Sequence, residues 1–396
     1  MAIRPPIRRP FPTEPGKTSI AGLYALENMS RAVIGPVIAL EGMRILGDAQ
    51  QLSVILFVGS IFSMAIMLSS GWFIRKFSRK FVFTAASVMA VVAAFFYVQE
   101  NALSFGIATA LRTAGAGLVM AVVSLYIMDF IPSEDLPKAE ARKILMAAST
   151  WICFPIIGVW LWSNSSHSSP FVVSGFAAVL MFLFFWYLRV KEADAIQVPN
   201  AKSLNIFQSL RKYFSNRNLT IAYLISFVRA TFWYMLFTYS PVYIVHAGLH
   251  ESWSGIFVGV ITSVLLLSDY FARIGQRFGI RRSIRFSFFL GGICLTAIGL
   301  LPEPTVYALI FWFVASLTAD MLDVVGNLPF MRIVDEDERV EMTMVFATCR
   351  EMAVTVTPGI GALILFFFPI EALFIFWGLL FLAVGSVVMK LPRHVD

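Results

Sequence analysis

The sequence has 396 residues, of which 58% are hydrophobic and 14% are charged, and its formal net charge is +7. So large an apolar share excludes a water-soluble globular domain, and the long apolar runs predict a chain that crosses a lipid bilayer many times. Cys153, Cys294 and Cys349 lie singly inside apolar runs. This placement indicates packing residues and predicts no disulfide, metal site or cofactor.

Two sets of apolar runs follow each other along the chain. Residues 1–18 are polar and predict a tail without a cleaved signal peptide. The first bundle, 19–190, then has runs near 19–46, 52–74, 81–98, 104–131, 143–162 and 170–189. A polar linker, 191–218, precedes a second bundle, 219–390, with runs near 219–246, 253–273, 284–301, 306–331, 342–368 and 371–389. Residues 391–396 form the second tail, so the pattern predicts an all-α membrane protein with twelve spans.

The basic residues predict the orientation of these spans. No lysine or arginine falls in the six connections expected on the outer side, whereas every connection on the other side carries them. Positive charge is retained on the cytoplasmic side during insertion, so both termini are expected in the cytoplasm, and the membrane is expected to be a bacterial inner membrane. Because the placement of the basic residues is explained by membrane orientation, the positive net charge predicts no nucleic-acid partner.

The two sets of runs echo each other, which indicates an internal repeat. Pro36-Val37 recurs as Pro241-Val242, and the stretch from Pro155 to Gly158 recurs from Pro358 to Gly361. Paired halves with a binding site between them are how many secondary transporters alternate their access to the two sides.

The connection after the second span carries a family resemblance. It reads Gly71-Trp-Phe-Ile-Arg75-Lys76-Phe-Ser-Arg79-Lys80, and a related basic turn that includes Arg277 follows the eighth span. This stretch resembles the Gly-x-x-x-Asp-Arg-x-Gly-Arg-Arg/Lys signature of the major facilitator superfamily, although Arg75 stands where the family has its acid. Arg112 with the glycines after it, and Pro155 with Gly158, are similar to stretches of its twelve-span drug/proton antiporters. The resemblance implies two pseudo-symmetric six-helix bundles.

The missing acid leads to a gate hypothesis. The connection between spans ten and eleven reads Asp335-Glu336-Asp337-Glu338, and the resemblance implies that it faces the basic turn of the other half. We expect these acids to pair with Arg75, Lys76, Arg79 and Lys80 in a charge-reversed cytoplasmic gate. The alternative is that the acids only balance a basic cytoplasmic face.

Charged residues inside the predicted spans mark the candidate site. Ionisable groups in hydrocarbon cost at least about 2.5–3.5 kcal/mol, so each should face a cavity or a partner. They are Glu27, Arg31, Arg112, Arg229, Asp320, Asp323, Arg350 and Glu351. Except for Arg350 and Glu351, which are expected as an ion pair at the interface, they lie in spans one, four, seven and ten, which the resemblance implies line the central cavity.

Helical spacing assigns roles to these residues. Ser316, Asp320, Asp323 and Asn327 share one face of span ten, and Arg229 shares a face with Trp233 and Phe237. Arg31, Arg112 and Arg229 are candidates for binding an anionic substrate group. Glu27, Asp320 and Asp323 are candidates for proton coupling, since a carboxylate near the midplane can load and release a proton. Alternatively, Glu27–Arg31 and Asp323–Arg350 are permanent ion pairs.

The predicted function is proton-coupled secondary transport of a small organic molecule by a monomer in the bilayer, with export favoured. Two alternatives stay open: import of an organic anion, and a non-transporting receptor or assembly factor with the same fold. An enzyme is not expected, because no nucleophile arrangement or phosphate-binding Gly-rich loop is present.

Overall fold

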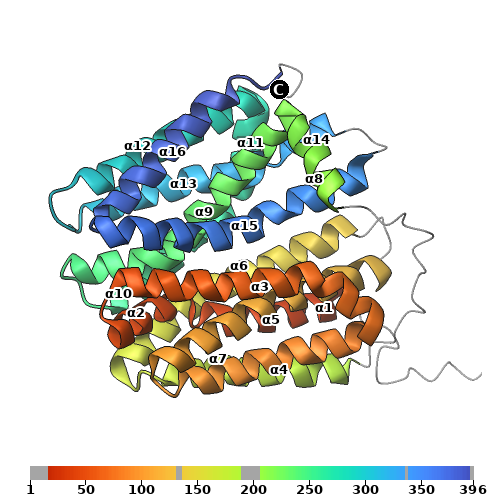
Figure 1. Ribbon diagram of the computed structural model, residues 1–396, viewed down its shortest axis with the longest axis vertical. Coiled ribbons are helices and arrows are strands. Elements are labelled where there is room, and N and C mark those ends of the chain that lie inside the picture. Colours follow the sequence, from red (N-terminus) through yellow and green to blue (C-terminus); the bar gives the residue numbers. More distant parts are fainter. Residues whose placement is uncertain (1–16, 131–135, 189–205, 335–337, 393–396) are drawn as a thin grey trace, which may run out of the picture.

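The computed structural model describes residues 17–130, 136–188, 206–334 and 338–392. Two bundles of helices lie one above the other, with the first half of the chain in red to yellow and the second in green to blue (Figure 1). Helix α1 begins and helix α16 ends on the same side of the molecule, on the right in Figure 1, and this side is here named the termini side. The opposite side is named the far side.

In its described residues, the first bundle contains seven helices. They are α1 Lys17–Ala32, α2 Gly35–Leu46, α3 Ala49–Phe77, α4 Arg79–Tyr97, α5 Ala102–Phe130, α6 Leu136–Asn164 and α7 Ser169–Tyr187. Short connections join them, and side chains of Asp48 and Ser78 cap α3 and α4 at their first turns.

The second bundle is preceded by a short helix within the predicted linker, α8 Ile206–Ser215. The bundle itself consists of α9 Arg217–His246, α10 Ser252–Ser263, the 3₁₀ turn η2 Val264–Leu267, α11 Ser268–Phe278, α12 Ile280–Leu300, α13 Ala308–Val325, α14 Leu328–Ile333, α15 Arg339–Phe367 and α16 Glu371–Val388. The domain boundaries proposed from the sequence stay predictions.

Within the described ranges, eleven helical segments are long and apolar enough to span a membrane. The twelfth crossing is the first predicted span, which the structure divides into α1 and α2. The prediction of twelve spans in an all-α membrane protein is therefore confirmed.

Three of the predicted spans are broken rather than continuous. Span one breaks at Val33–Ile34, where Pro36 at the start of α2 lacks the N–H that would continue the helix from α1. Span ten breaks at Gly326–Asn327, ahead of Pro329 in α14. Span eight narrows into η2 between α10 and α11. The two prolines of the sequence repeat, Pro36 and Pro241, therefore have different structural settings: Pro36 follows a helix break, whereas Pro241 lies inside the continuous helix α9.

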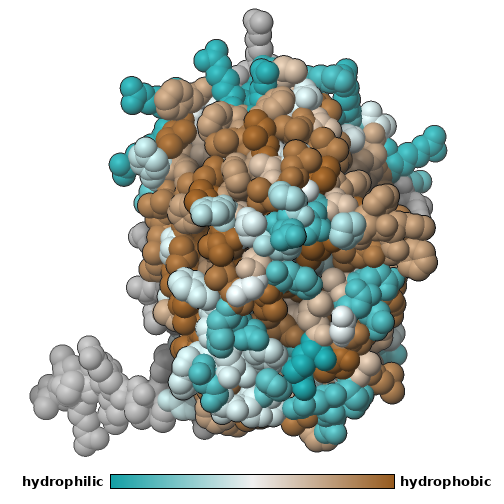
Figure 2. Space-filling view, turned by 90° about the vertical axis from the view of Figure 1, so that its left-hand side faces the viewer, coloured by the Kyte–Doolittle hydropathy of each residue, from teal (hydrophilic) through white to brown (hydrophobic). Residues whose placement is uncertain are grey.

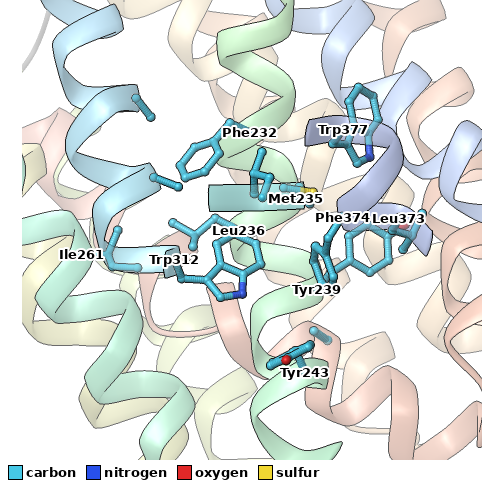
Figure 3. Packing of buried hydrophobic residues seen from close by; sticks show 14 of the residues in the cluster. Phe232, Met235, Leu236, Tyr239, Tyr243, Ile261, Trp312, Leu373, Phe374 and Trp377 are labelled. Carbon is cyan, nitrogen blue, oxygen red and sulfur yellow. The ribbon is translucent and has the colours of Figure 1, made fainter. Parts of the chain in front are cut away.

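The core of the second bundle consists of large aromatic side chains. Phe232 and Tyr239 of α9 lie with Trp312 of α13 and with Phe374 and Trp377 of α16 (Figure 3). All five are at most 1% exposed. Because lipid is as apolar as these side chains, they stabilise the bundle through close van der Waals packing between its helices.

The two bundles meet closely on the far side. The hydroxyls of Ser53 in α3 and Tyr239 in α9 are 2.8 Å apart and both residues are fully buried. Gly255 and Gly259 of α10 lie against α6, where an added Cβ would come within 2.7 Å of the Pro155 carbonyl oxygen and 2.6 Å of the Ile152 carbonyl oxygen. This close backbone contact is named the far-side seam. Figure 2 looks onto the far-side face, where hydrophilic and hydrophobic patches alternate.

Candidate functional site

A cavity of about 520 Å³ lies between the two bundles. Its walls come from both of them: α1, α2, α3, α5 and α6 on one side and α9, α10, η2, α13 and α15 on the other. This volume is within the roughly 300–1,000 Å³ typical of small-molecule sites. The cavity is therefore the candidate binding site.

The wall from the first bundle carries a polar cluster on α1, named the N-cluster and consisting of Glu27, Asn28, Arg31 and Trp151. Arg31 Nε lies 2.7 Å from Glu27 Oε1, and Arg31 Nη2 donates to Asn28 Oδ1 at 3.2 Å. Trp151 of α6 donates from Nε1 to the same Asn28 oxygen at 3.0 Å, and its ring lies 6.0 Å from the Arg31 guanidinium carbon. The predicted i, i+4 arrangement of Glu27 and Arg31 is thus an ion pair in the structure.

The wall from the second bundle carries a similar set, named the C-cluster and consisting of Arg229, Trp233, Asp323 and Asn327. Arg229 Nε lies 3.1 Å from Asp323 Oδ1, and Arg229 Nη1 donates to Asn327 Oδ1 at 3.2 Å. Trp233 Nε1 donates to Asp323 Oδ2 at 2.8 Å. The ion pair Asp323–Arg350 that the sequence left open is replaced by Asp323–Arg229.

Arg229 lies at the break in span ten. The carbonyl oxygen of Leu322 accepts a hydrogen bond from Arg229 Nη1 at 3.4 Å in addition to the helical bond from the Gly326 N–H at 2.7 Å. Beyond the end of α13, Asn327 Oδ1 accepts from Ser226 Oγ at 3.0 Å and from Arg229. Arg229 therefore links α9 both to α13 and to the residue at the break.

Ser316 and Asp320 share the predicted face of span ten but lie outside the cavity wall. Ser316 is fully buried and donates to the Phe313 carbonyl oxygen of its own helix at 2.7 Å. Asp320 is 1% exposed, and neither of its carboxylate oxygens has a hydrogen-bond partner among the described residues. Of the four polar residues on this face, Asp323 lines the cavity.

Arg112 of α5 and Arg350 of α15 also line the cavity, from opposite bundles. The expected ion pair between Arg350 and Glu351 is not formed in the described structure. Consecutive residues of a helix point about 100° apart, so the two side chains diverge. Arg350 Nη1 instead lies 3.6 Å from Met120 Sδ of the first bundle.

Aromatic rings form part of the wall between these charges. Phe237 of α9 lies between two indoles, with ring centroids 4.8 Å from Trp151 and 6.1 Å from Trp233. The sequence placed Trp233 and Phe237 together, but not Trp151 or Asn28. Asn28 could have been predicted as a site residue because it stands next to Glu27 in the sequence. The apolar run around Trp151 gives no indication that this side chain faces the cavity.

The residues of the predicted gate are only partly described. Gly71, Arg75 and Lys76 lie in the last turns of α3, Arg79 and Lys80 begin α4, and Arg277 is near the end of α11. Lys76 Nζ lies 4.6 Å from the Trp72 ring centre. Glu338 pairs with Lys212 of α8 at 2.8 Å, within its own half of the chain. Asp335, Glu336 and Asp337 lie outside the described residues, so the charge-reversed gate stays a prediction.

The described ranges contain no group of three or more His, Cys, Asp or Glu side chains that could hold a metal ion. His246 Nδ1 lies 2.8 Å from the Val242 carbonyl oxygen, one turn back on the same helix.

Comparison with solved structures supports a transporter fold. A POT family transporter in complex with a thioalcohol-conjugated peptide superposes with a TM-score of 0.78 at 10% identity, covering 96% of each chain. A peptide transporter POT in complex with sulfate gives 0.75 at 13% identity, covering 98% of this chain and 96% of that one. The nucleoside transporter NupG gives 0.75 at 11% identity, covering 94% and 98%. At these identities the likeness concerns the fold.

Sequence comparison identifies the family. No curated protein sequence matches the chain. The profile of the Major Facilitator Superfamily, however, matches residues 20–301, well over half of the chain. Together with the twelve crossings and the cavity between two bundles, this match makes the protein an integral multi-pass membrane protein that belongs to the major facilitator superfamily.

Proposed function

We propose that the protein is a proton-coupled secondary transporter that moves a small organic molecule by alternating access. The observation that carries this proposal is the cavity of about 520 Å³, whose walls come from both bundles and which lies beside the far-side seam. A site shared by two bundles changes its access when one bundle rocks against the other.

The orientation and direction of transport rest on sequence. The lysines and arginines of the connections favour a cytoplasmic location for both termini, and the bacterial inner membrane is the proposed location. The stretches around Arg112 and Pro155 favour export. Four arginines but only Asp323 and Glu351 line the cavity, which favours the alternative of an organic anion over a cationic drug.

Asp320 is the proposed proton carrier. Glu27 and Asp323 are each held by an arginine at 2.7 Å and 3.1 Å, whereas the described part of the chain offers Asp320 no partner. An ionised carboxylate buried without a partner costs several kcal/mol, so a protonated Asp320 is favoured in this conformation. Asp320 lies one helical turn from Asp323, so its proton state acts on the Asp323–Arg229 pair.

Proteoliposomes loaded with pyranine test this mechanism. Wild-type protein is expected to move protons when challenged with a solute from a panel of organic anions, cations and neutral molecules. Asp320→Asn is expected to abolish that proton movement, because an amide cannot load a proton, while leaving solute exchange without a gradient intact.

The matched control is Ser316→Ala, which removes a hydroxyl bonded only within its own helix on the same face. It is expected to keep proton movement. Proton movement by Asp320→Asn at the wild-type rate would reject Asp320 as the carrier, and a wild type that moves protons with no member of the panel would reject proton coupling.

A further inference from the structure

The cavity contains two kinds of arginine. Arg31 and Arg229 are each paired with a carboxylate, Glu27 and Asp323, and each also binds an asparagine side chain. Their donors are directed to the protein. Of the three arginines that the sequence predicts for anion binding, Arg31 and Arg229 are therefore occupied by ion pairs within the protein, and Arg112 remains.

Arg112 and Arg350 differ from Arg31 and Arg229 in their contacts. In the residues that the structure describes, neither has a carboxylate oxygen within 4.0 Å. Arg112 Nε is buried without a hydrogen-bond acceptor among the described residues, and a buried donor without an acceptor is costly, so an acceptor from outside the protein would stabilise it. The Arg350 side chain is exposed, and the polar contact that the described residues offer its guanidinium is the thioether of Met120, a weak acceptor.

The charge balance of the cavity agrees with an external anion. Four arginines line it, and Asp323, Glu351 and the Arg31-bound Glu27 oppose them, which leaves one positive charge in excess. Arg350 reaches the first bundle at Met120 of α5, about two helical turns along the helix that carries Arg112, so one ligand in the cavity can approach both arginines from opposite bundles. One negative charge placed there would balance the site.

The same cavity is also lined by aromatic rings. Trp151, Phe237 and Trp233 form a row of rings that ends at the Arg31 and Arg229 clusters. A ligand with an aromatic or aliphatic body would pack on these rings while its charged end reaches the arginines.

We propose that the transported substrate is an organic monoanion with an apolar body, whose carboxylate or equivalent acid group is bound between Arg112 of the first bundle and Arg350 of the second. This proposal rests on the proposed transport function and names its substrate class. Because one anion bridges two bundles that otherwise present like charges to each other, the substrate also favours their approach on the termini side.

A thermal-shift measurement on the purified full-length protein in detergent tests the proposal without any gradient. The probes are 4-phenylbutyrate, 4-phenylbutanol and 4-phenylbutylamine, which share a body and differ in charge. Binding to the folded state raises its apparent Tm, and only the carboxylate is expected to do so. Equal stabilisation by the alcohol or the amine would overturn the proposal.

Substitutions then locate the carboxylate. Arg112→Gln and Arg350→Gln are each expected to weaken 4-phenylbutyrate binding by about tenfold or more, the equivalent of one charge-assisted hydrogen bond. Arg282→Gln, at an exposed arginine of α12, is the matched control and is expected to bind as the wild type does. Wild-type affinity in both cavity variants would overturn the assignment.

Two further results separate this proposal from the transport mechanism. If a glutamine variant does not fold, Arg112→Lys and Arg350→Lys keep the charge and are expected to retain selectivity for the carboxylate over the amine; loss of that selectivity in folded lysine variants would contradict a charge-based site. Carboxylate-selective binding without proton movement would support the proposed substrate class and reject proton coupling. Proton movement driven by amines would support proton coupling and reject the proposed substrate class.

Discussion

The N-cluster and the C-cluster contain the same four kinds of group: an arginine, a carboxylate, an asparagine oxygen and an indole N–H. They differ in what they connect. In the N-cluster, the ion pair Glu27–Arg31 lies within one helix, and Trp151 of α6 joins the cluster through its hydrogen bond to Asn28. In the C-cluster, Arg229 joins α9 to α13 across a helix break. The same chemistry therefore attaches a side chain to its own helix in one half and holds two helices together in the other.

The largest expected effect comes from removing the arginine of each cluster. Arg229→Met is expected to lower the free energy of unfolding by about 2–4 kcal/mol, since it removes the cation paired with Asp323 and a donor to Asn327. Arg31→Met is expected to lower the free energy of unfolding by less, about 1–2 kcal/mol. The partners of Arg31 lie on its own helix, and Glu27 also interacts with Arg112 and Arg350. Chemical unfolding in detergent measures both.

A double-mutant cycle sharpens this result. Combining Arg229→Met with Asp323→Asn is expected to cost much less than the sum of the single changes, because each removes the same interaction. Additive losses, or an Arg31→Met variant as unstable as Arg229→Met, would contradict the difference between the clusters.

An intermediate effect is expected from the two indoles. Trp233→Phe removes a donor to a carboxylate and is expected to cost roughly 1.5–3 kcal/mol, whereas Trp151→Phe removes a donor to an amide oxygen and is expected to cost roughly 0.5–1.5 kcal/mol. Both variants keep a ring against Phe237. Equal losses in apparent Tm would show that ring packing, not the acceptor, sets the cost.

The smallest effect is expected outside the clusters, at the pair Lys212–Glu338. Both side chains are more than a third exposed, at 48% and 37%, and such pairs contribute about 0–1 kcal/mol. Lys212→Ala is therefore expected to change the apparent Tm little, and any change should disappear at high salt. A large, salt-independent loss would instead indicate that α8 braces the second bundle through this contact.

The sequence predicts the architecture of the protein better than its polar contacts. Twelve spans follow from apolar length and from the placement of lysine and arginine, both of which are local properties. The ion pair Glu27–Arg31 is also local, at i, i+4. Arg229–Asp323 joins residues 94 positions apart and depends on how α9 and α13 pack, which periodicity cannot give.

The helix breaks show a similar limit. Pro36 and Pro329 mark the breaks in spans one and ten, yet Pro155, Pro241 and Pro358 lie inside continuous helices, so proline alone does not decide. Span eight becomes η2 without a glycine or proline at the turn. At the break in span ten, Arg229 and Ser226 of α9 both donate to Asn327, and such contacts depend on how the helices pack, which the sequence of one helix does not give.

The far-side seam depends on the absence of two side chains. At Gly255 and Gly259, helix α10 approaches α6 so closely that an added Cβ would come within 2.7 Å of a carbonyl oxygen, and the side chains of Val159 and Ile156 pack against the same glycines. A larger residue at either position would therefore hold the two bundles apart on the far side. These two glycines thus set how tightly the cavity can be shut from that side.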